Sequence, residues 1–164
     1  MKAILLFFST AVFCSIANVV LGKNILLVPC QITSHFIQQN EMTSGLVQNG
    51  HKVYTVISSS FTEKDKALKD WITPLYFHQP QGTTFVGDLT PLFFSLDKFT
   101  LGTMSSEVTL QECEAMVRDK KLNEDIKRIG FDLAIVDGFV MSYCTFLLPH
   151  IHGIPFVFTF RSSV

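Results

Sequence analysis

Two polar side chains in this sequence, His35 and Asp137, are of the types that together perform acid–base chemistry. His35 follows the short apolar run 24–28, and Asp137 closes a second apolar run that begins at Leu133. Histidine exchanges a proton readily near neutral pH. A carboxylate behind the ring orients it and stabilises its protonated form. The pair therefore predicts a general base that can take a proton from a hydroxyl.

The two side chains can meet only if both apolar runs are strands of one parallel sheet. The carboxyl ends of parallel strands share an edge, and ligands bind there. We therefore expect the His35 ring and the Asp137 carboxylate to lie within hydrogen-bond reach, or one water apart. The alternative for His35 is a turn residue capped by Ser34, and the alternative for Asp137 is an N-cap for a helix after Gly138.

The region around His35 has the pattern of a strand, a crossover helix and a second strand. We expect strands over 24–28 and 52–58, and between them a helix that begins near His35. Thr33 or Ser34 is a suitable N-cap, and Asn49-Gly50 is a helix-stop signal. Such a βαβ unit is right-handed and parallel almost without exception.

The rest of the chain continues the alternation of strands and helices, which predicts an α/β fold with a doubly wound, mostly parallel, Rossmann-like sheet. The segment 79–103 has no clear period. The expected elements are a short charged helix over 61–71, a strand over 75–77, a helical stretch over 109–129 that stops at Gly130, a strand over 133–136, a helix over 141–151 kinked or shortened by Pro149, and a strand over 156–160. Because the chain stops at Val164, just beyond the last of these strands, we expect the sheet to be incomplete and open at one edge.

Charge and hydropathy limit the function classes. A net charge of −1 gives no electrostatic footprint for nucleic acid or an anionic membrane surface. Residues 1–22 carry Lys2 and then an apolar run, which predicts a signal peptide and entry into the secretory pathway. The alternative is an uncleaved anchor helix over 4–21, since that stretch is long enough to span a bilayer.

The cysteines and the other histidines do not predict a metal site. Beyond the predicted signal peptide, Cys30, Cys113 and Cys144 match no zinc pattern, and we favour buried thiols over a single disulfide. We interpret Asp132 as a turn residue and His51 as a structural residue at a helix end. The histidines without partners at metal-ligand spacing also include His78, His150 and His152.

Two long segments, 24–58 and 131–161, resemble the N-terminal domain of the animal UDP-glucuronosyltransferase family. The order and spacing of several motifs carry this resemblance over about half of the chain. These motifs are Ser34-His35-Phe36, Leu46-Val47-Gln48-Asn49-Gly50-His51-Lys52-Val53, Phe131-Asp132-Leu133 through Asp137, and Gly153-Ile154-Pro155-Phe156-Val157.

The resemblance implies the N-terminal domain of a GT-B glycosyltransferase, which holds a small lipophilic acceptor while a C-terminal domain holds the UDP-sugar. It implies an inverting transfer of glucuronic acid or a hexose, with His35 as base and Asp137 as its partner. The UDP-sugar is then a co-substrate, and no cofactor or metal is expected. Phenylalanines between Phe85 and Phe99 could line an apolar acceptor pocket, or simply pack in the core. The residues expected to bind the acceptor are Ser34, Phe36, Phe93 and Phe94.

The resemblance also implies a domain organisation and a location. Residues 1–22 would be the signal peptide and residues 23–164 the acceptor-binding domain, so that this chain looks like a fragment without its donor domain and membrane anchor. The expected location is the lumen or membrane of the endoplasmic reticulum. The alternative function is a non-catalytic lumenal module that binds lipophiles or forms homo- or hetero-oligomers with full-length transferases.

Overall fold

A five-stranded, fully parallel sheet forms the centre of the molecule. The computed structural model describes residues 22–61, 68–79, 98–138 and 145–160. Its elements are β1 (Asn24–Val28), α2 (Thr33–Gln48), β2 (Lys52–Ser58), β3 (Ile72–Phe77), α4 (Lys98–Arg118), α5 (Lys120–Ile129), β4 (Leu133–Asp137), α6 (Leu147–Ile151) and β5 (Phe156–Thr159). The strand order is β3-β2-β1-β4-β5, and every neighbouring pair is parallel. This confirms the predicted α/β, Rossmann-like fold.

The strand order reverses between β1 and β4. From β1 the chain moves outward to β2 and β3, and it then returns to place β4 on the other side of β1. The two strands align Ile25 with Leu133 and Val28 with Val136. A reversal of this kind opens a crevice beyond the carboxyl ends of the two central strands, which is where ligands bind in open α/β sheets.

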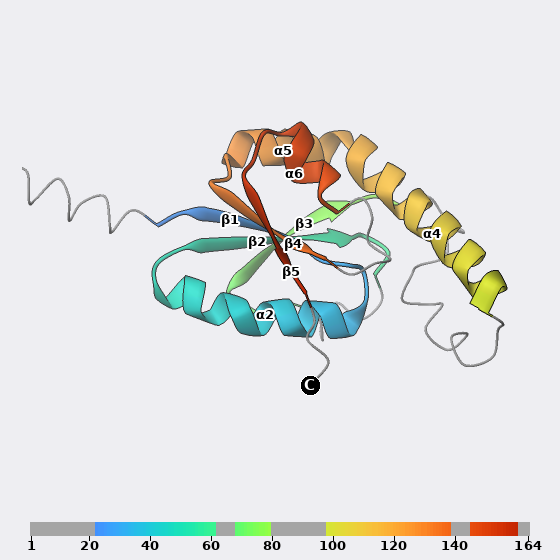
Figure 1. Cartoon of the computed structure of the whole chain (residues 1–164). Coiled ribbons are helices and arrows are strands. Elements are labelled where there is room, and N and C mark those ends of the chain that lie inside the picture. Colours follow the sequence, from blue (N-terminus) through green and yellow to red (C-terminus); the bar gives the residue numbers. More distant parts are fainter. Residues whose placement is uncertain (1–21, 62–67, 80–97, 139–144, 161–164) are drawn as a thin grey trace, which may run out of the picture.

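Helices cover both faces of the sheet, with α2 on one face and α4, α5 and α6 on the other (Figure 1). Side chains alternate between the faces along each strand. On the α2 side the core comprises Ile25, Leu27, Val53, Ile72 and Ile135. On the opposite side it comprises Leu26, Val28, Val56, Leu75, Phe77, Met116, Leu122, Ile126, Ala134, Val136, Leu148 and Ile154. Because successive residues alternate, Asp137 falls on the same face as Ile135, toward α2.

One helix boundary differs from the expectation over 109–129. The expected continuous helix is two helices, α4 and α5, because Asp119 has an extended backbone conformation between them. Its Oδ1 accepts a hydrogen bond from the backbone N–H of Leu122 at 2.8 Å. Its Oδ2 accepts another from the N–H of His78 at 2.8 Å. Asp119 thus caps α5 and at the same time holds the end of β3.

Two further boundaries were predicted incorrectly. The strand β3 begins at Ile72 and includes Pro74, which an outermost strand tolerates because one side of it needs no ladder hydrogen bonds. The N-cap position of helix α2 is occupied by neither Thr33 nor Ser34. Its N-cap is Ile32, whose carbonyl accepts hydrogen bonds from the N–H groups of residues 35 and 36. The predicted stop is confirmed, since Gly50 has a φ of 81°.

Two expected elements fall partly outside the described residues. They are the helix over 61–71 and the start of the helix over 141–151. The part of the latter that is described, α6, contains Pro149 as its third residue, where a missing N–H costs little. Cys30 carries a buried thiol, as expected. Cys113 is disulfide-bonded, which corrects the expectation of a thiol there. Within the described ranges, no helix has both the length and the hydropathy needed to cross a membrane.

Polar contacts fasten the amino ends of β1 and β4 together. The Asp132 carboxylate accepts hydrogen bonds from the backbone N–H of Asn24 at 2.9 Å and from Lys23 Nζ at 3.0 Å. These contacts, with the Asn24 N–H first, hold the pKa of Asp132 below its ordinary value of 3.8. Lys23 also donates its backbone N–H to Nδ1 of His51 at 3.1 Å. Asp132 and His51, interpreted as structural residues, therefore connect three segments of the chain.

Replacement of Asp132 by alanine should lower the free energy of unfolding by roughly 1 kcal/mol at neutral pH, the usual net value of a charge-assisted hydrogen bond at a partly exposed site. A carboxylate with a lowered pKa stabilises the fold above its unfolded-state pKa, and this stabilisation is lost as the pH falls through the folded-state pKa. The difference between Asp132→Ala and the parent should therefore disappear in acid below pH 3.8. Urea denaturation at several pH values measures it.

Asp125 provides a matched control, because its pKa is also lowered, by Arg128 first and then Lys121, but all three residues lie in α5. Asp125→Ala removes helical ion pairs worth about 0.2–0.5 kcal/mol each. The absence of any Asp132→Ala loss at neutral pH, or a loss that persists in acid, would contradict the stabilising role of the Asp132 contacts with Lys23 and Asn24.

Candidate active site

The His35 ring and the Asp137 carboxylate contact each other at the carboxyl edge of the sheet. Nδ1 of His35 lies 2.5 Å from Oδ2 of Asp137. Both residues are only 5% exposed. The prediction that these side chains meet is confirmed, although they are 102 residues apart in the chain.

The backbone explains why these two residues meet. Asp137 is the last residue of β4, directly beyond the aligned pair Val28 and Val136. His35 is the third residue of α2, which begins after a short turn that follows β1. The backbone N–H of Cys30, in that turn, donates to the same Oδ2 at 3.3 Å. Asp137 therefore holds both the histidine ring and the turn that carries it.

Two further polar side chains support this region, Gln31 in the turn after β1 and Thr145 next to the end of β4. Gln31 is buried; its amide N–H groups donate to the carbonyls of Pro29 and Val56, both at 3.3 Å, and its Oε1 accepts from the N–H of Ser58 at 3.0 Å. Thr145 donates its hydroxyl to the backbone carbonyl of Asp137 at 3.1 Å. Neither was predicted, because glutamine and threonine are common polar residues, and the contacts of Gln31 with Val56 and Ser58 join the turn to a different strand, β2.

This arrangement fixes the roles of the two imidazole nitrogens. A carboxylate accepts hydrogen bonds, so Nδ1 of His35 carries the hydrogen that points to Asp137. Nε2, on the other side of the ring, is then the nitrogen with a lone pair in the neutral imidazole. The buried carboxylate would stabilise positive charge on the ring if Nε2 took a proton. The site can therefore perform general base chemistry on a hydroxyl or an acid.

The four residues predicted to bind the acceptor differ in their exposure to solvent and in whether the structure describes them. Ser34 is exposed next to His35. Phe36 is 1% exposed and packs in a cluster with Ile57 and Phe61, its ring centroid 5.0 Å from that of Phe61. Phe93 and Phe94 lie outside the described residues. Their roles in acceptor binding stay predictions.

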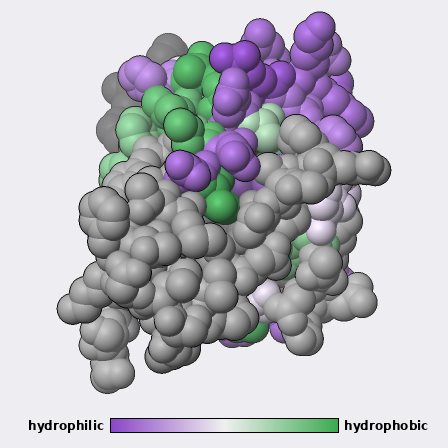
Figure 2. Space-filling view, turned by 90° about the vertical axis from the view of Figure 1, so that its right-hand side faces the viewer, coloured by the Kyte–Doolittle hydropathy of each residue, from purple (hydrophilic) through white to green (hydrophobic). Residues whose placement is uncertain are grey.

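The side of the molecule toward which β1, β2 and β3 point exposes both hydrophobic and hydrophilic residues in its described part (Figure 2).

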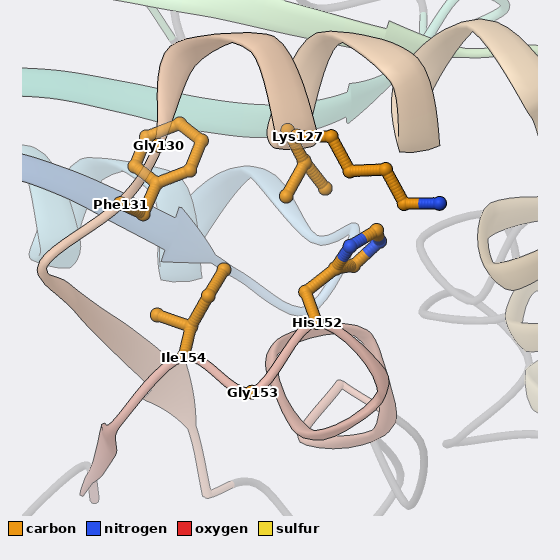
Figure 3. Close-up of a pocket in the computed structure, with 7 residues that line it drawn as sticks. Lys127, Gly130, Phe131, His152, Gly153 and Ile154 are labelled. Atoms are coloured by element: carbon orange, nitrogen blue, oxygen red, sulfur yellow. The ribbon is translucent and has the colours of Figure 1, made fainter.

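A pocket of about 290 Å³ lies elsewhere, between the turns that lead into β4 and β5. Lys127 and His152 lie along one wall of it (Figure 3). Burial, and then the charge of Lys127, lowers the pKa of His152. This pocket is at the amino edge of the sheet and does not include His35 or Asp137.

Comparison with known protein families and curated proteins gives one consistent result. Residues 23–164 match the model of the family described as UDP-glucoronosyl and UDP-glucosyl transferase. UDP-glucuronosyltransferase 3A1 of Bos taurus is 27% identical over 151 residues, which cover 87% of this chain and 28% of that protein. UDP-glucuronosyltransferase 2A2 of Homo sapiens is 25% identical over 166 residues, covering 91% of this chain and 30% of that protein. The chain thus spans less than a third of the length of these relatives.

Solved structures of glycosyltransferases share the fold. CalG4, the calicheamicin glycosyltransferase, aligns with a TM-score of 0.60 at 18% identity, over 88% of this chain and 32% of its own. The glycosyltransferase of kitacinnamycin aligns with a TM-score of 0.58 at 17% identity, over 85% of this chain and 30% of its own. With the family model matching nearly the whole chain on this fold, the protein belongs to the UDP-glucoronosyl and UDP-glucosyl transferase family of glycosyltransferase enzymes.

Proposed function

We propose that this chain is the acceptor-binding part of an enzyme that transfers a sugar from a UDP-sugar to a small lipophilic acceptor. In this proposal His35 is the base and Asp137 its partner. The observation that carries it is the buried contact of 2.5 Å between the two side chains, located where the strand order reverses. Family membership supplies the reaction class, and the contact supplies the residues.

The proposed reaction is a single displacement at the anomeric carbon of the sugar. Nε2 of His35 takes the proton of the acceptor hydroxyl while the acceptor oxygen forms a bond to that carbon. The bond between the carbon and the UDP oxygen breaks, and UDP leaves with the electron pair on its phosphate. Attack opposite the leaving group inverts the configuration. Asp137 holds the Nδ1 hydrogen and stabilises the imidazolium that forms.

The donor half of the reaction is proposed to lie in a second domain. The departing UDP needs hydrogen-bond donors and positive charge positioned for it. The chain covers less than a third of its curated relatives, whose names refer to glucuronosyl transfer. We place the acceptor domain at 23–164, after a signal peptide over 1–22 that directs it to the endoplasmic reticulum. The start of β1 at Asn24 supports this boundary.

Turnover should require both the acceptor domain and a donor domain. Residues 23–164 alone should bind lipophilic phenols weakly and turn over no UDP-sugar. The same residues joined to a matching donor domain should show turnover. In that chimera, His35→Ala should reduce kcat by roughly 10²–10⁴-fold, the usual contribution of a general base. Asp137→Asn should cost a comparable factor, because it removes the charge that holds the imidazolium. A fluorescent phenol and purified chimera provide the assay.

His150→Ala is the matched control, because His150 is an exposed histidine of α6. It should leave turnover unchanged. Full activity of His35→Ala would remove the base assignment, and turnover by residues 23–164 alone would show that no second domain is needed. Phenol binding without any turnover by the chimera would favour the non-catalytic binding module.

The contact between His35 and Asp137 should also stabilise the fold. Asp137→Ala leaves the buried ring and the N–H of Cys30 without their shared carboxylate. Removing one partner of a buried hydrogen bond to a charged group costs about 1–3 kcal/mol. His35→Ala should also destabilise the fold, and the double variant should lose less than the sum of the two. Urea unfolding of the four proteins measures the coupling, and strictly additive losses would show that the two side chains do not interact in solution.

A further inference from the structure

Gln39 is a buried polar side chain close to the proposed base. No described protein contact explains why a polar group is buried there. It is 3% exposed, and neither its amide nitrogen nor its amide oxygen has a hydrogen-bond partner among the described residues. It lies four residues after His35 in α2, and residues at this spacing lie one above the other on the same helix face. The amide therefore lies one helical turn from the proposed base.

An amide in this state is costly for a folded protein. Buried polar groups are nearly always hydrogen-bonded, and each exception calls for an explanation. Neighbouring polar residues on the same helix do not share the problem, since the hydroxyl of Thr43 donates to the backbone carbonyl of Asn40 at 2.7 Å. A side chain that is kept polar, buried and without a protein partner is one that a ligand can satisfy.

We propose that the Gln39 amide binds a second polar group of the acceptor and so selects acceptors that carry two such groups. This inference rests on the proposed function, because it takes the acceptor hydroxyl to lie at His35. Residues four apart on a helix have Cβ atoms about 5–6 Å from each other, so both side chains are within reach of one small aromatic molecule. The favoured acceptors are therefore phenols that carry a second hydrogen-bonding group on the ring.

The test compares two probes that differ in one hydroxyl, 4-(hydroxymethyl)phenol and 4-methylphenol. Calorimetric titration of the full chain should show roughly tenfold tighter binding of the first, which corresponds to one net hydrogen bond. Gln39→Met keeps the volume of the side chain and removes its hydrogen-bonding atoms. This variant should bind the two phenols with about equal affinity. Binding of 4-methylphenol should persist. Gln39→Asn, which retains an amide, should keep part of the preference.

A thermal measurement separates this role from a purely structural one. Replacing an unsatisfied buried amide by an apolar group of similar size should raise the Tm of Gln39→Met, so selectivity falls while stability rises. Gln79→Met is the control: Gln79 is equally buried with an unpartnered amide, but it follows β3, which is two strands away from β1. It should raise Tm and leave the preference unchanged.

Equal binding of the two phenols by the parent chain would overturn the inference, as would a preference that survives in Gln39→Met. Loss of the preference in Gln79→Met to the same extent would also overturn it. Failure of the proposed function is read from a different experiment, the turnover of the His35→Ala chimera. A chimera that depends on His35 but shows no role for Gln39 would reject this inference alone.

Discussion

The contact between His35 and Asp137 is the constraint on which the rest of the structure depends. A carboxylate removed from water needs hydrogen-bond donors, and Asp137 finds them in the His35 ring and the N–H of Cys30. Both donors follow β1, so the contact exists only because β1 and β4 are neighbours in parallel register. The alternation of side chains along β4 then turns Asp137 toward α2. A slip of one residue would turn it to the opposite face.

The two edges of the sheet have different roles. At the amino edge, Asp132 and Lys23 fasten β1 to β4 with exposed hydrogen bonds and an ion pair. At the carboxyl edge the polar groups are buried, and Gln31 adds hydrogen bonds from the turn after β1 to the end of β2. Buried polar networks are rigid when every member is satisfied. The base is thus held by a satisfied network, with the unsatisfied amide of Gln39 one turn away.

Local patterns predicted the elements around the site better than the elements between them. The βαβ unit over 24–58 follows from an apolar run, a helix stop at Gly50 and an alternating strand. The break at Asp119 was missed because the hydrophobic positions continue across it with helical spacing. Asp119 caps α5 at this break and also accepts from the N–H of His78, and a contact with a residue distant in sequence cannot be read from a local pattern. Pro74 was placed outside β3 because its tolerance depends on the strand being at the edge.

The sequence by itself determined the apolar strands, the helix stop, the α/β class and the motifs through which family membership was recognised. These properties depend on residue type and short-range spacing. Only the tertiary structure decided that β4 lies beside β1 and that Asp137 reaches His35 across 102 residues. It also decided that Gln31 has hydrogen-bond partners while Gln39 has none among the described residues. The physical reason is that hydrogen-bond satisfaction and burial depend on which distant segments become neighbours. A buried glutamine is thus fully hydrogen-bonded at position 31 and without a described partner at position 39.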